Sequence, residues 1–463
     1  MVFSSLFFLY IFLPLCLLLY FIQRSLTAKN IVLVCASLVF YAWGEPMYVL
    51  LMLAVSALNW GFSLAFEKKR SRALLALCVA LNLSGLIVFK YAGFLVENCN
   101  AIFKTAFAVP QISLPIGISF YTFQALSYSV DVYRKDVAAQ RSYWKLLLYV
   151  SMFPQLIAGP IVRYADIAPQ LDSRQTTLED VSSGACRFVI GLSKKVLLAN
   201  VLYELITAFQ QSRDLSVLYF WLYAVSFALQ LYFDFSGYSD MAIGLGRIFG
   251  FRFQENFNYP YISGSITEFW RRWHISLGSW FRDYVYIPLG GNRVSKAKWL
   301  RNILVVWMLT GLWHGASWNF VLWGLGFAVL LVAEKLVYGR LLQRTHVLKH
   351  VYTLLLVTLS FVLFNADSVS EAVLQLGAMF GAGGLPLVST EGVYYLKSYA
   401  GTFLFAAIGA TPLVSNAISR FGKTRFGAQA LTVLQPLVML ALLAACTAFL
   451  VDGSFNPFLY FRF

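Results

Sequence analysis

One histidine stands in the middle of an uncharged segment of this chain. His314 lies in the sequence Trp313-His314-Gly315, and the 32 residues 302–333 contain no Asp, Glu, Lys or Arg. Burial disfavours the imidazolium form, so a buried ring stays neutral and can accept a proton. The chemistry that this favours is general-base catalysis, in which the ring activates a hydroxyl nucleophile. A buried histidine whose nitrogens are satisfied by neighbouring groups is the structural alternative.

Two polar residues follow the histidine closely. Ser317 and Asn319 stand three and five positions after it. Either could orient the imidazole or donate a hydrogen bond to a developing oxyanion. Ordinary hydrogen bonding within a helix is the favoured explanation for each of them taken alone.

A second histidine belongs to an aromatic and basic segment. Ser265 and Glu268 have the spacing of a capping box, which predicts that a helix begins there. Arg271 and Arg272 interrupt the apolar pattern and would face water or an anionic ligand, which predicts a helix in the membrane interface. His274 falls on the aromatic face and must find a polar partner or a cavity. That face comprises Trp270, Trp273, His274, Leu277, Trp280, Phe281 and Tyr284.

Two acids flank a third polar segment. Asp234 and Asp240 bracket Phe235-Ser-Gly-Tyr238-Ser239 at the end of an apolar run, and Arg247 and Arg252 follow. Buried carboxylates usually pair with basic groups or hydroxyls, so a structural network is predicted. A proton or cation pathway is the alternative, because intramembrane acids serve that purpose in transporters.

The elements that must position these residues are membrane segments. Hydrophobic residues make up 59% of the chain and charged residues only 12%, against about 25% charged in soluble proteins. A spanning helix needs roughly 20 apolar residues. About eleven uncharged runs could span or partly enter a bilayer: 1–22, 30–44, 46–66, 73–89, 105–130, 146–162, 215–233, 302–333, 351–365, 398–419 and 426–451. The sequence therefore predicts an all-α polytopic membrane protein, with residues 1–463 as one integral membrane domain.

The run around His314 is too long for one simple crossing. As a single straight helix, residues 302–333 would extend about 48 Å, against a hydrocarbon core of about 30 Å. Gly311, Gly315, Gly324 and Gly326 offer places to bend. A re-entrant hairpin or a tilted, broken helix is predicted, with His314 deep in the membrane beside a cavity, since irregular backbone there must be buried in protein or line a wet cavity.

The early loops predict an orientation. Arg24 and Lys29 follow the first run, and the basic segment 68–72 follows the third, whereas the turn at Glu45-Pro46 has no basic residue. The positive-inside rule places the two basic loops in the cytoplasm and the N-terminus outside.

Several other classes of function are disfavoured. The net charge of +15 is spread over many short loops, where cytoplasmic exposure and anionic headgroups account for it, so nucleic acid is an unexpected partner. The chain contains no HExxH, Walker A or GxSxG motif and no Cys/His spacing typical of a metal site. No metal is expected.

Four segments together resemble a known family. They are Leu114-Pro-Ile-Gly-Ile-Ser-Phe120, Tyr232-Phe-Asp-Phe-Ser-Gly-Tyr-Ser-Asp-Met-Ala-Ile-Gly244, Glu268-Phe-Trp-Arg-Arg-Trp-His-Ile-Ser-Leu277 and Trp313-His-Gly-Ala-Ser-Trp-Asn-Phe320. In this order they resemble the membrane-bound O-acyltransferase family, and within it the membrane subunits of bacterial alginate O-acetylation, with peptidoglycan O-acetylation proteins close. The resemblance runs from Met1 to the closing residues Pro457-Phe-Leu-Tyr-Phe461.

The resemblance implies a polytopic fold with re-entrant elements around a tunnel in the bacterial inner membrane. It implies that His314 and His274 are catalytic and that acetyl-CoA is the cytoplasmic acyl donor. The acetyl group would pass to a periplasmic or membrane-tethered partner protein or to a polysaccharide. Arg271 and Arg272 could then meet the phosphates of coenzyme A. The residues expected to line the tunnel or to support the structure around it are Trp313, Ser317, Asn319, Asp234, Tyr238 and Asp240.

Two rival hypotheses remain. In the first, the chain is a proton-coupled transporter of a glycan or small acid, with Asp234, Asp240 and His314 as the relay. Transporters often show paired repeats with matching broken helices, and none is evident in this sequence. In the second, the chain is a non-catalytic scaffold of an export complex, and both histidines would be dispensable.

Overall fold

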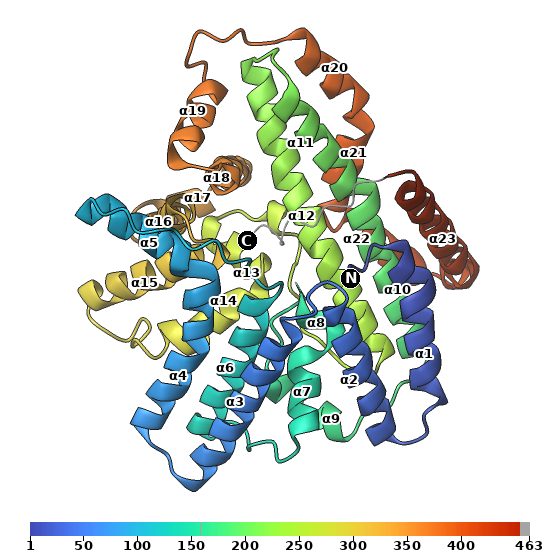
Figure 1. The fold of residues 1–463 in the computed structure, drawn as a ribbon. Helices are drawn as coiled ribbons and strands as arrows, with labels where there is room; N and C mark the ends of the chain where they lie inside the picture. The colour runs from blue at the N-terminus through green and yellow to red at the C-terminus, as the bar shows by residue number, and fades with distance from the viewer. Residues whose placement is uncertain (158, 454–463) are drawn as a thin grey trace. The chain divides into compact units, whose positions relative to one another are not determined.

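The fold consists of helices. A computed structural model describes residues 1–157 and 159–453, and no strand occurs among them. The predicted all-α polytopic architecture is confirmed (Figure 1). The quoted motif at residues 457–461 lies outside the described residues.

The helices group into two compact units. Unit 1 comprises residues 1–188 and 238–254, and unit 2 comprises residues 189–237 and the chain from Glu255 on. The described part of unit 1's first segment contains ten α-helices, the last of which continues into unit 2 after residue 188. They are α1 (Leu13–Ile22), α2 (Leu26–Ala42), α3 (Val49–Lys68), α4 (Arg72–Leu86), α5 (Ala92–Phe103), α6 (Ile118–Arg134), α7 (Tyr143–Ser151), α8 (Phe153–Leu156), α9 (Tyr164–Asp172) and α10 (Leu178–Ser193). The prediction of one integral domain remains a proposal.

Unit 2 carries the histidines. Its helices are α11 (Val201–Gln211), α12 (Val217–Ile248, as far as residue 237), α13 (Ile266–Arg272), α14 (Ile275–Phe281), α15 (Lys296–His314), α16 (Trp318–Ala333), α17 (Gly339–Gln343), α18 (Leu348–Asn365), α19 (Val369–Met379), α20 (Thr390–Ser398), α21 (Ala400–Gly409), α22 (Leu413–Gly422) and α23 (Arg425–Asp452). Short π-helical or 3-10 segments lie at 8–12, 87–91, 194–200, 260–262, 282–286 and 334–338.

Fewer segments can cross a bilayer than the sequence suggested. Within the described chain, six helices are long and apolar enough to span, or up to seven if α21 and α22, bent by 60°, form one broken span. The six are 49–68, 72–103, 217–248, 318–343, 348–365 and 425–452. Many large apolar side chains on them are exposed, as lipid-facing surfaces require. The chain is a multi-pass membrane protein.

The runs 1–22 and 30–44 form only the shorter apolar helices Phe8–Ile22 and Leu26–Ala42, and two further runs are not spanning helices either. In the run 105–130, the first thirteen residues are not helical and α6 begins only at Ile118. The run 146–162 contains the end of α7 and the four-residue α8, followed by irregular backbone. Apolar composition alone predicted these segments, and it does not distinguish a span from a short helix buried inside the protein.

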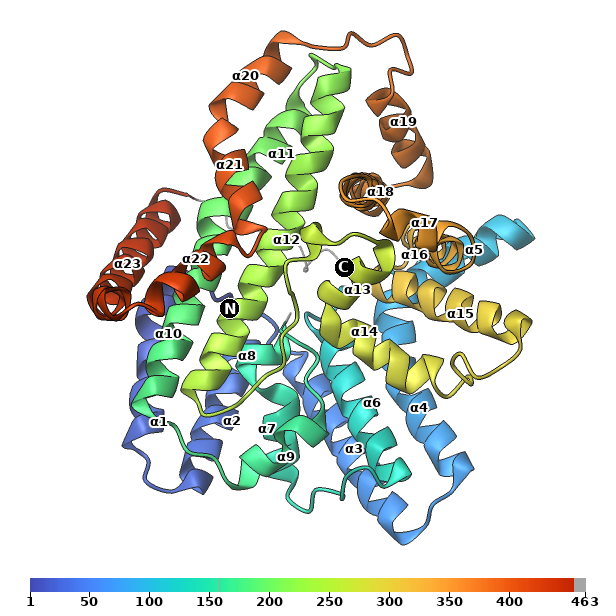
Figure 2. The same cartoon turned by 180° about the vertical axis from the view of Figure 1, so that it is seen from behind.

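The basic connectors lie together in unit 1. The α1–α2 and α3–α4 connectors are at the same end of this unit in both views (Figures 1 and 2). Arg141, in the α6–α7 connector, forms a 2.6 Å ion pair with Glu67 near the end of α3. This grouping gives unit 1 one end that is rich in basic residues (Figures 1 and 2).

Helices α15 and α16 pack against each other as a hairpin (Figure 2). Gly311 and Gly324 permit this packing, because a Cβ at Gly311 would lie 2.2 Å from the Phe320 carbonyl oxygen. At Gly324 it would lie 2.2 Å from that of Trp307. The break predicted within 302–333 is thus confirmed, between Gly315 and Ser317.

Candidate functional site

His314 is the last residue of α15, at the tip of the hairpin. Its side chain is buried, with 4% of the residue exposed. Aromatic rings surround it edge-on: the ring centroids of Trp313, Trp323 and Phe364 lie 4.9, 5.2 and 5.2 Å from that of the imidazole. The predicted burial is confirmed.

His274 lies between two short helices rather than within one. The predicted continuous helix from Ser265 is wrong, because α13 ends at Arg272 and α14 begins at Ile275. His274 adopts φ +44°, ψ +53° at this break, a left-handed conformation that is uncommon for a residue with a side chain. Strained backbone of this kind clusters at functional sites.

The expected start of this segment is confirmed. The Ser265 hydroxyl accepts a hydrogen bond from the Glu268 amide at 3.0 Å. The Glu268 carboxylate in turn accepts from the Gly264 amide at 2.9 Å, one residue earlier than in the usual capping box.

His274 has the polar partner that its burial required. Its Nδ1 lies 3.1 Å from Oδ1 of Asn256, and only 1% of the residue is exposed. The ring packs edge-on against Phe235, with centroids 4.7 Å apart. Burial lowers the pKa of His274 from 6.5 to about 3, so the ring is neutral at physiological pH.

The indole of Trp313 connects the two histidines. Its ring centroid lies 5.7 Å from that of His274 and 4.9 Å from that of His314. We refer to His274, Trp313 and His314 as the histidine cluster. Residues separated by forty positions therefore meet in one aromatic core of unit 2, although the sequence places them in different elements.

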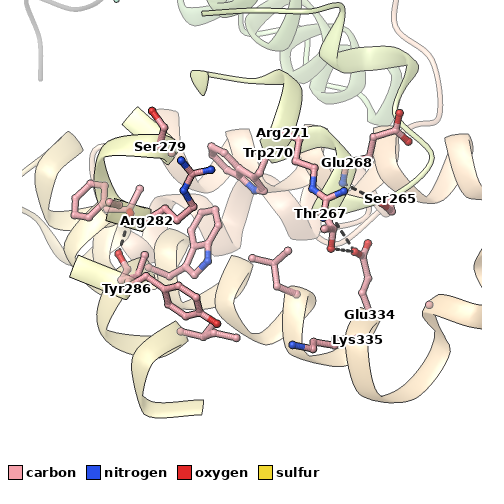
Figure 3. Close-up of a pocket in the computed structure, with 18 of the residues that line it drawn as sticks. Ser265, Thr267, Glu268, Trp270, Arg271, Ser279, Arg282, Tyr286, Glu334 and Lys335 are labelled. Atoms are coloured by element: carbon pink, nitrogen blue, oxygen red, sulfur yellow. Dashed lines mark hydrogen bonds between the residues drawn. The ribbon is translucent and has the colours of Figure 1, made fainter. Parts of the chain in front are cut away.

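A cavity of about 1230 Å³ opens beside this cluster (Figure 3). His274 and Thr310 line it, whereas His314 is not among the lining residues. The walls are rich in aromatic and basic side chains from α13, α14, α15 and α17 and from the π-helical segments 282–286 and 334–338. The basic residues are Arg271, Arg282, Lys335 and Arg340, and the tryptophans are Trp270, Trp299 and Trp307.

The two arginines predicted to meet a cofactor lie in different surroundings. Arg271 is exposed and lines the cavity. Arg272 is not a lining residue: it forms a 2.9 Å ion pair with Glu268 and donates to the Asn258 carbonyl at 3.1 Å. The two residues face different directions because neighbouring positions on a helix do not share a face.

A buried acid holds the first turn of α13. The Glu334 carboxylate accepts hydrogen bonds from the amides of Ile266 and Thr267 at 2.6 and 3.0 Å, and from the Thr267 hydroxyl at 2.7 Å (Figure 3). An anion is stabilised there by unsatisfied amides and the helix dipole. Glu334 follows α16, so it ties the helix after His314 to the helix before His274.

Asp234 and Asp240 are paired with basic side chains, as predicted, but their partners are not the expected arginines. Asp234 pairs with Lys195 at 2.6 Å, with side chains 1% and 3% exposed, in unit 2. In unit 1, Asp240 pairs with Arg187 at 2.9 Å. Tyr238 stacks on Phe3, with centroids 4.6 Å apart.

The expected partners Arg247 and Arg252 both contact Asp180 instead. Hydrogen bonds from Thr177, together with these arginines, lower the pKa of Asp180 to about 2. Proximity in sequence misled the prediction, because positions along α12 point in different directions around the helix and Arg252 lies beyond its end.

Of the two polar residues after His314, Asn319 has structural contacts. Asn319 donates to the carbonyls of Ala366 and Leu363, at 2.8 and 3.4 Å, at the end of α18. Ser317 precedes α16 as its N-cap residue, and its side chain makes no capping hydrogen bond. Neither contact concerns the imidazole.

Sequence reasoning missed Asn256, Lys195 and Glu334. Asn256 belongs to a polar loop without a motif, and Lys195 is one of two adjacent lysines. Glu334 directly follows the uncharged run, which was a usable signal, since a buried acid at a helix end needs a partner. In the described chain, no group of three His, Cys, Asp or Glu could hold a metal ion.

Sequence comparisons relate the chain to known proteins. The sequence profile of the membrane-bound O-acyltransferase family matches residues 121–369, which include both histidines. A probable alginate O-acetylase from Azotobacter vinelandii is 39% identical over the full length of both chains. One from Pseudomonas aeruginosa is 42% identical over 88% of this chain and 80% of its own.

A peptidoglycan O-acetyltransferase from Helicobacter pylori is 35% identical over 84% of this chain and 81% of its own. The names of these relatives describe O-acetylation of alginate or peptidoglycan. This chain is a membrane-bound acyltransferase. The protein belongs to the membrane-bound O-acyltransferase family.

Proposed function

We propose that this chain transfers an acetyl group from cytoplasmic acetyl-CoA across the bacterial inner membrane. The acceptor is a hydroxyl of a periplasmic or membrane-tethered partner protein or of a polysaccharide, for O-acetylation of alginate or a related cell-surface glycan. The names of the alginate and peptidoglycan relatives support acetyl as the transferred group and a glycan as the final acceptor. The N-terminus faces the periplasm in this proposal, in accord with the basic connectors of unit 1.

One observation carries the proposal: two buried histidines meet around Trp313 beside a cavity lined by cations. In the proposed reaction His314 accepts the proton of the acceptor hydroxyl as its oxygen attacks the thioester carbonyl carbon. The carbon–sulfur bond then breaks, and the thiolate of coenzyme A takes the proton from the His314 imidazolium. The products are the acetyl ester and free coenzyme A. A covalent acetyl intermediate is a variant of the same chemistry.

The cavity is the proposed donor site. Coenzyme A carries phosphates, and Arg271, Lys335 and Arg340 reach the cavity from different segments of unit 2. Guanidinium groups bind phosphate through charge-assisted hydrogen bonds. Arg272 has a weaker claim to this role, because Glu268 already neutralises it.

The donor site is tested with acetyl-CoA itself. Arg271→Ala removes one charge-assisted contact of about 1.5–3 kcal/mol, which corresponds to a rise of about 10- to 140-fold in the KM for acetyl-CoA. The rate of free-thiol release by purified protein in proteoliposomes measures this constant. Arg344→Ala is the matched control, since Arg344 is exposed and does not line the cavity.

An unchanged KM in Arg271→Ala would remove Arg271 from the donor site. Consumption of acetyl-CoA by the wild-type protein, with acetyl recovered on an added polymannuronate oligosaccharide or a co-reconstituted partner, would support the reaction. Uptake of an unmodified oligosaccharide without consumption of acetyl-CoA would instead favour a transporter. The ion pairs of Asp234 and Asp240 account for both acids without a proton relay.

A further inference from the structure

Asn256 is a fully buried residue in the loop before α13, and its side-chain oxygen meets three groups. Oδ1 lies 3.2 Å from the Ser276 amide nitrogen, 2.9 Å from the Ser276 hydroxyl and 3.1 Å from Nδ1 of His274. The Asn256 carbonyl also accepts a hydrogen bond from the Ile275 amide at 3.0 Å. One asparagine thus holds the ring and the backbone at the break between α13 and α14.

These contacts determine which atom of the amide faces the histidine. A backbone N–H can only donate, so the Asn256 atom beside the Ser276 amide is the oxygen and not the NH₂ group. The same oxygen faces Nδ1 of His274, and an oxygen acceptor requires a hydrogen on that nitrogen. In a neutral imidazole with Nδ1 protonated, Nε2 carries the lone pair.

Nε2 of His274 is buried and has no hydrogen-bond partner among the residues that the structure describes. His274 itself lines the cavity. A buried acceptor without a partner is costly, and the left-handed backbone at His274 adds strain. The unpaired acceptor and the strained backbone are both explained if Nε2 accepts a hydrogen bond from a bound ligand.

We propose that Asn256 is a positioning residue that fixes His274 in the Nδ1-protonated tautomer, so that Nε2 accepts a hydrogen bond from an O–H, S–H or N–H of the ligand in the cavity. This inference rests on the proposed function, because it assigns one step of ligand binding at the same site. His274 then receives a hydrogen from the ligand and does not stabilise negative charge as an imidazolium. The proton-accepting base of the reaction remains His314.

The tautomer is measured directly on the wild-type protein. The chain has four histidines, so ¹⁵N-histidine labelling in detergent or lipid gives few ring signals, and His274→Gln assigns the signal that disappears. The expected spectrum has a protonated Nδ1 and an unprotonated Nε2 from pH 5 to 8, and addition of coenzyme A shifts the Nε2 resonance. A protonated Nε2, or an Nε2 resonance insensitive to coenzyme A, would overturn the proposal.

Two variants of Asn256 separate positioning from structural support. Asn256→Asp keeps the acceptor and adds a charge that stabilises imidazolium, so the pKa of His274 rises and the KM for acetyl-CoA rises at acidic pH while it stays near the wild-type value at pH 8. Asn256→Leu removes the acceptor, and a rise of about 10-fold in the KM for acetyl-CoA is expected at every pH. An unchanged pH profile in Asn256→Asp would contradict the role.

Asn258→Leu is the matched control, because this exposed residue lies in the same loop and contacts Arg272 through its backbone. It should retain the wild-type KM for acetyl-CoA and the wild-type kcat. If Asn256→Leu does not fold, the wild-type spectrum still decides the question. The spectrum does not depend on acetyl transfer, so failure of the proposed function and failure of this inference give different results.

Discussion

Gly324 is the position where a single methyl group should most clearly disturb the hairpin. An alanine Cβ there would lie 2.2 Å from the Trp307 carbonyl oxygen and 3.2 Å from the Gly311 amide nitrogen. Backbone atoms cannot rotate away as a flexible side chain can, so α15 and α16 must separate by about 1 Å to restore van der Waals contact. Overpacking of this kind costs about 1–3 kcal/mol, against about 1 kcal/mol gained in helix propensity.

Gly326, on the same helix, is the matched control. A Cβ there meets nothing within 4 Å, so Gly326→Ala keeps only the propensity gain. We expect Gly324→Ala to melt below the wild-type protein in detergent and Gly326→Ala to melt at or above it. Because α15 ends at His314, Gly324→Ala should also lower the rate of acetyl transfer at temperatures where it is folded. Equal melting and equal activity of the two variants would refute the reasoning.

Three further perturbations have expected outcomes. Lys195→Met leaves Asp234 buried without its ion-pair partner and should destabilise the protein by about 3–5 kcal/mol, whereas addition of Asp234→Leu should recover most of this in a double-mutant melting cycle. Glu334→Ala exposes two amides of α13, so hydrogen exchange of residues 264–272 should accelerate, and unchanged exchange would exclude the anchoring role. His274 binds its proton only near pH 3 when folded and near 6.5 when unfolded. Stability should therefore fall by up to about 1.4 kcal/mol per pH unit as the pH drops from 6.5 toward 3, and that part of the slope should be absent in His274→Gln.

The sequence predicted the class of fold and the hairpin because both depend on local composition. Residues 302–333 are too long and too rich in glycine for one straight crossing, and the observed break falls beside His314. The start of α13 was predictable for the same reason, since a capping box involves neighbours in sequence.

The partners of the buried groups depend on tertiary packing and were not predictable. Helical periodicity continued through His274, whereas the chain breaks there because Asn256 holds the ring and the following backbone. In the same way, Asp234 pairs with Lys195, thirty-nine positions away, and not with the arginines that follow it. A single sequence shows that a buried charge needs a partner, but the fold decides which one it finds.

The central claim is that His314 is the base of acetyl transfer. His314→Gln keeps a polar side chain of similar size at the tip of the hairpin and removes the basic nitrogen. The measurement is the single-turnover rate of acetyl transfer from saturating acetyl-CoA in proteoliposomes, with melting temperature and membrane insertion as controls. The account predicts a loss of about 10²- to 10⁴-fold in this rate for a folded, inserted variant. A rate within a few fold of the wild-type protein would contradict it.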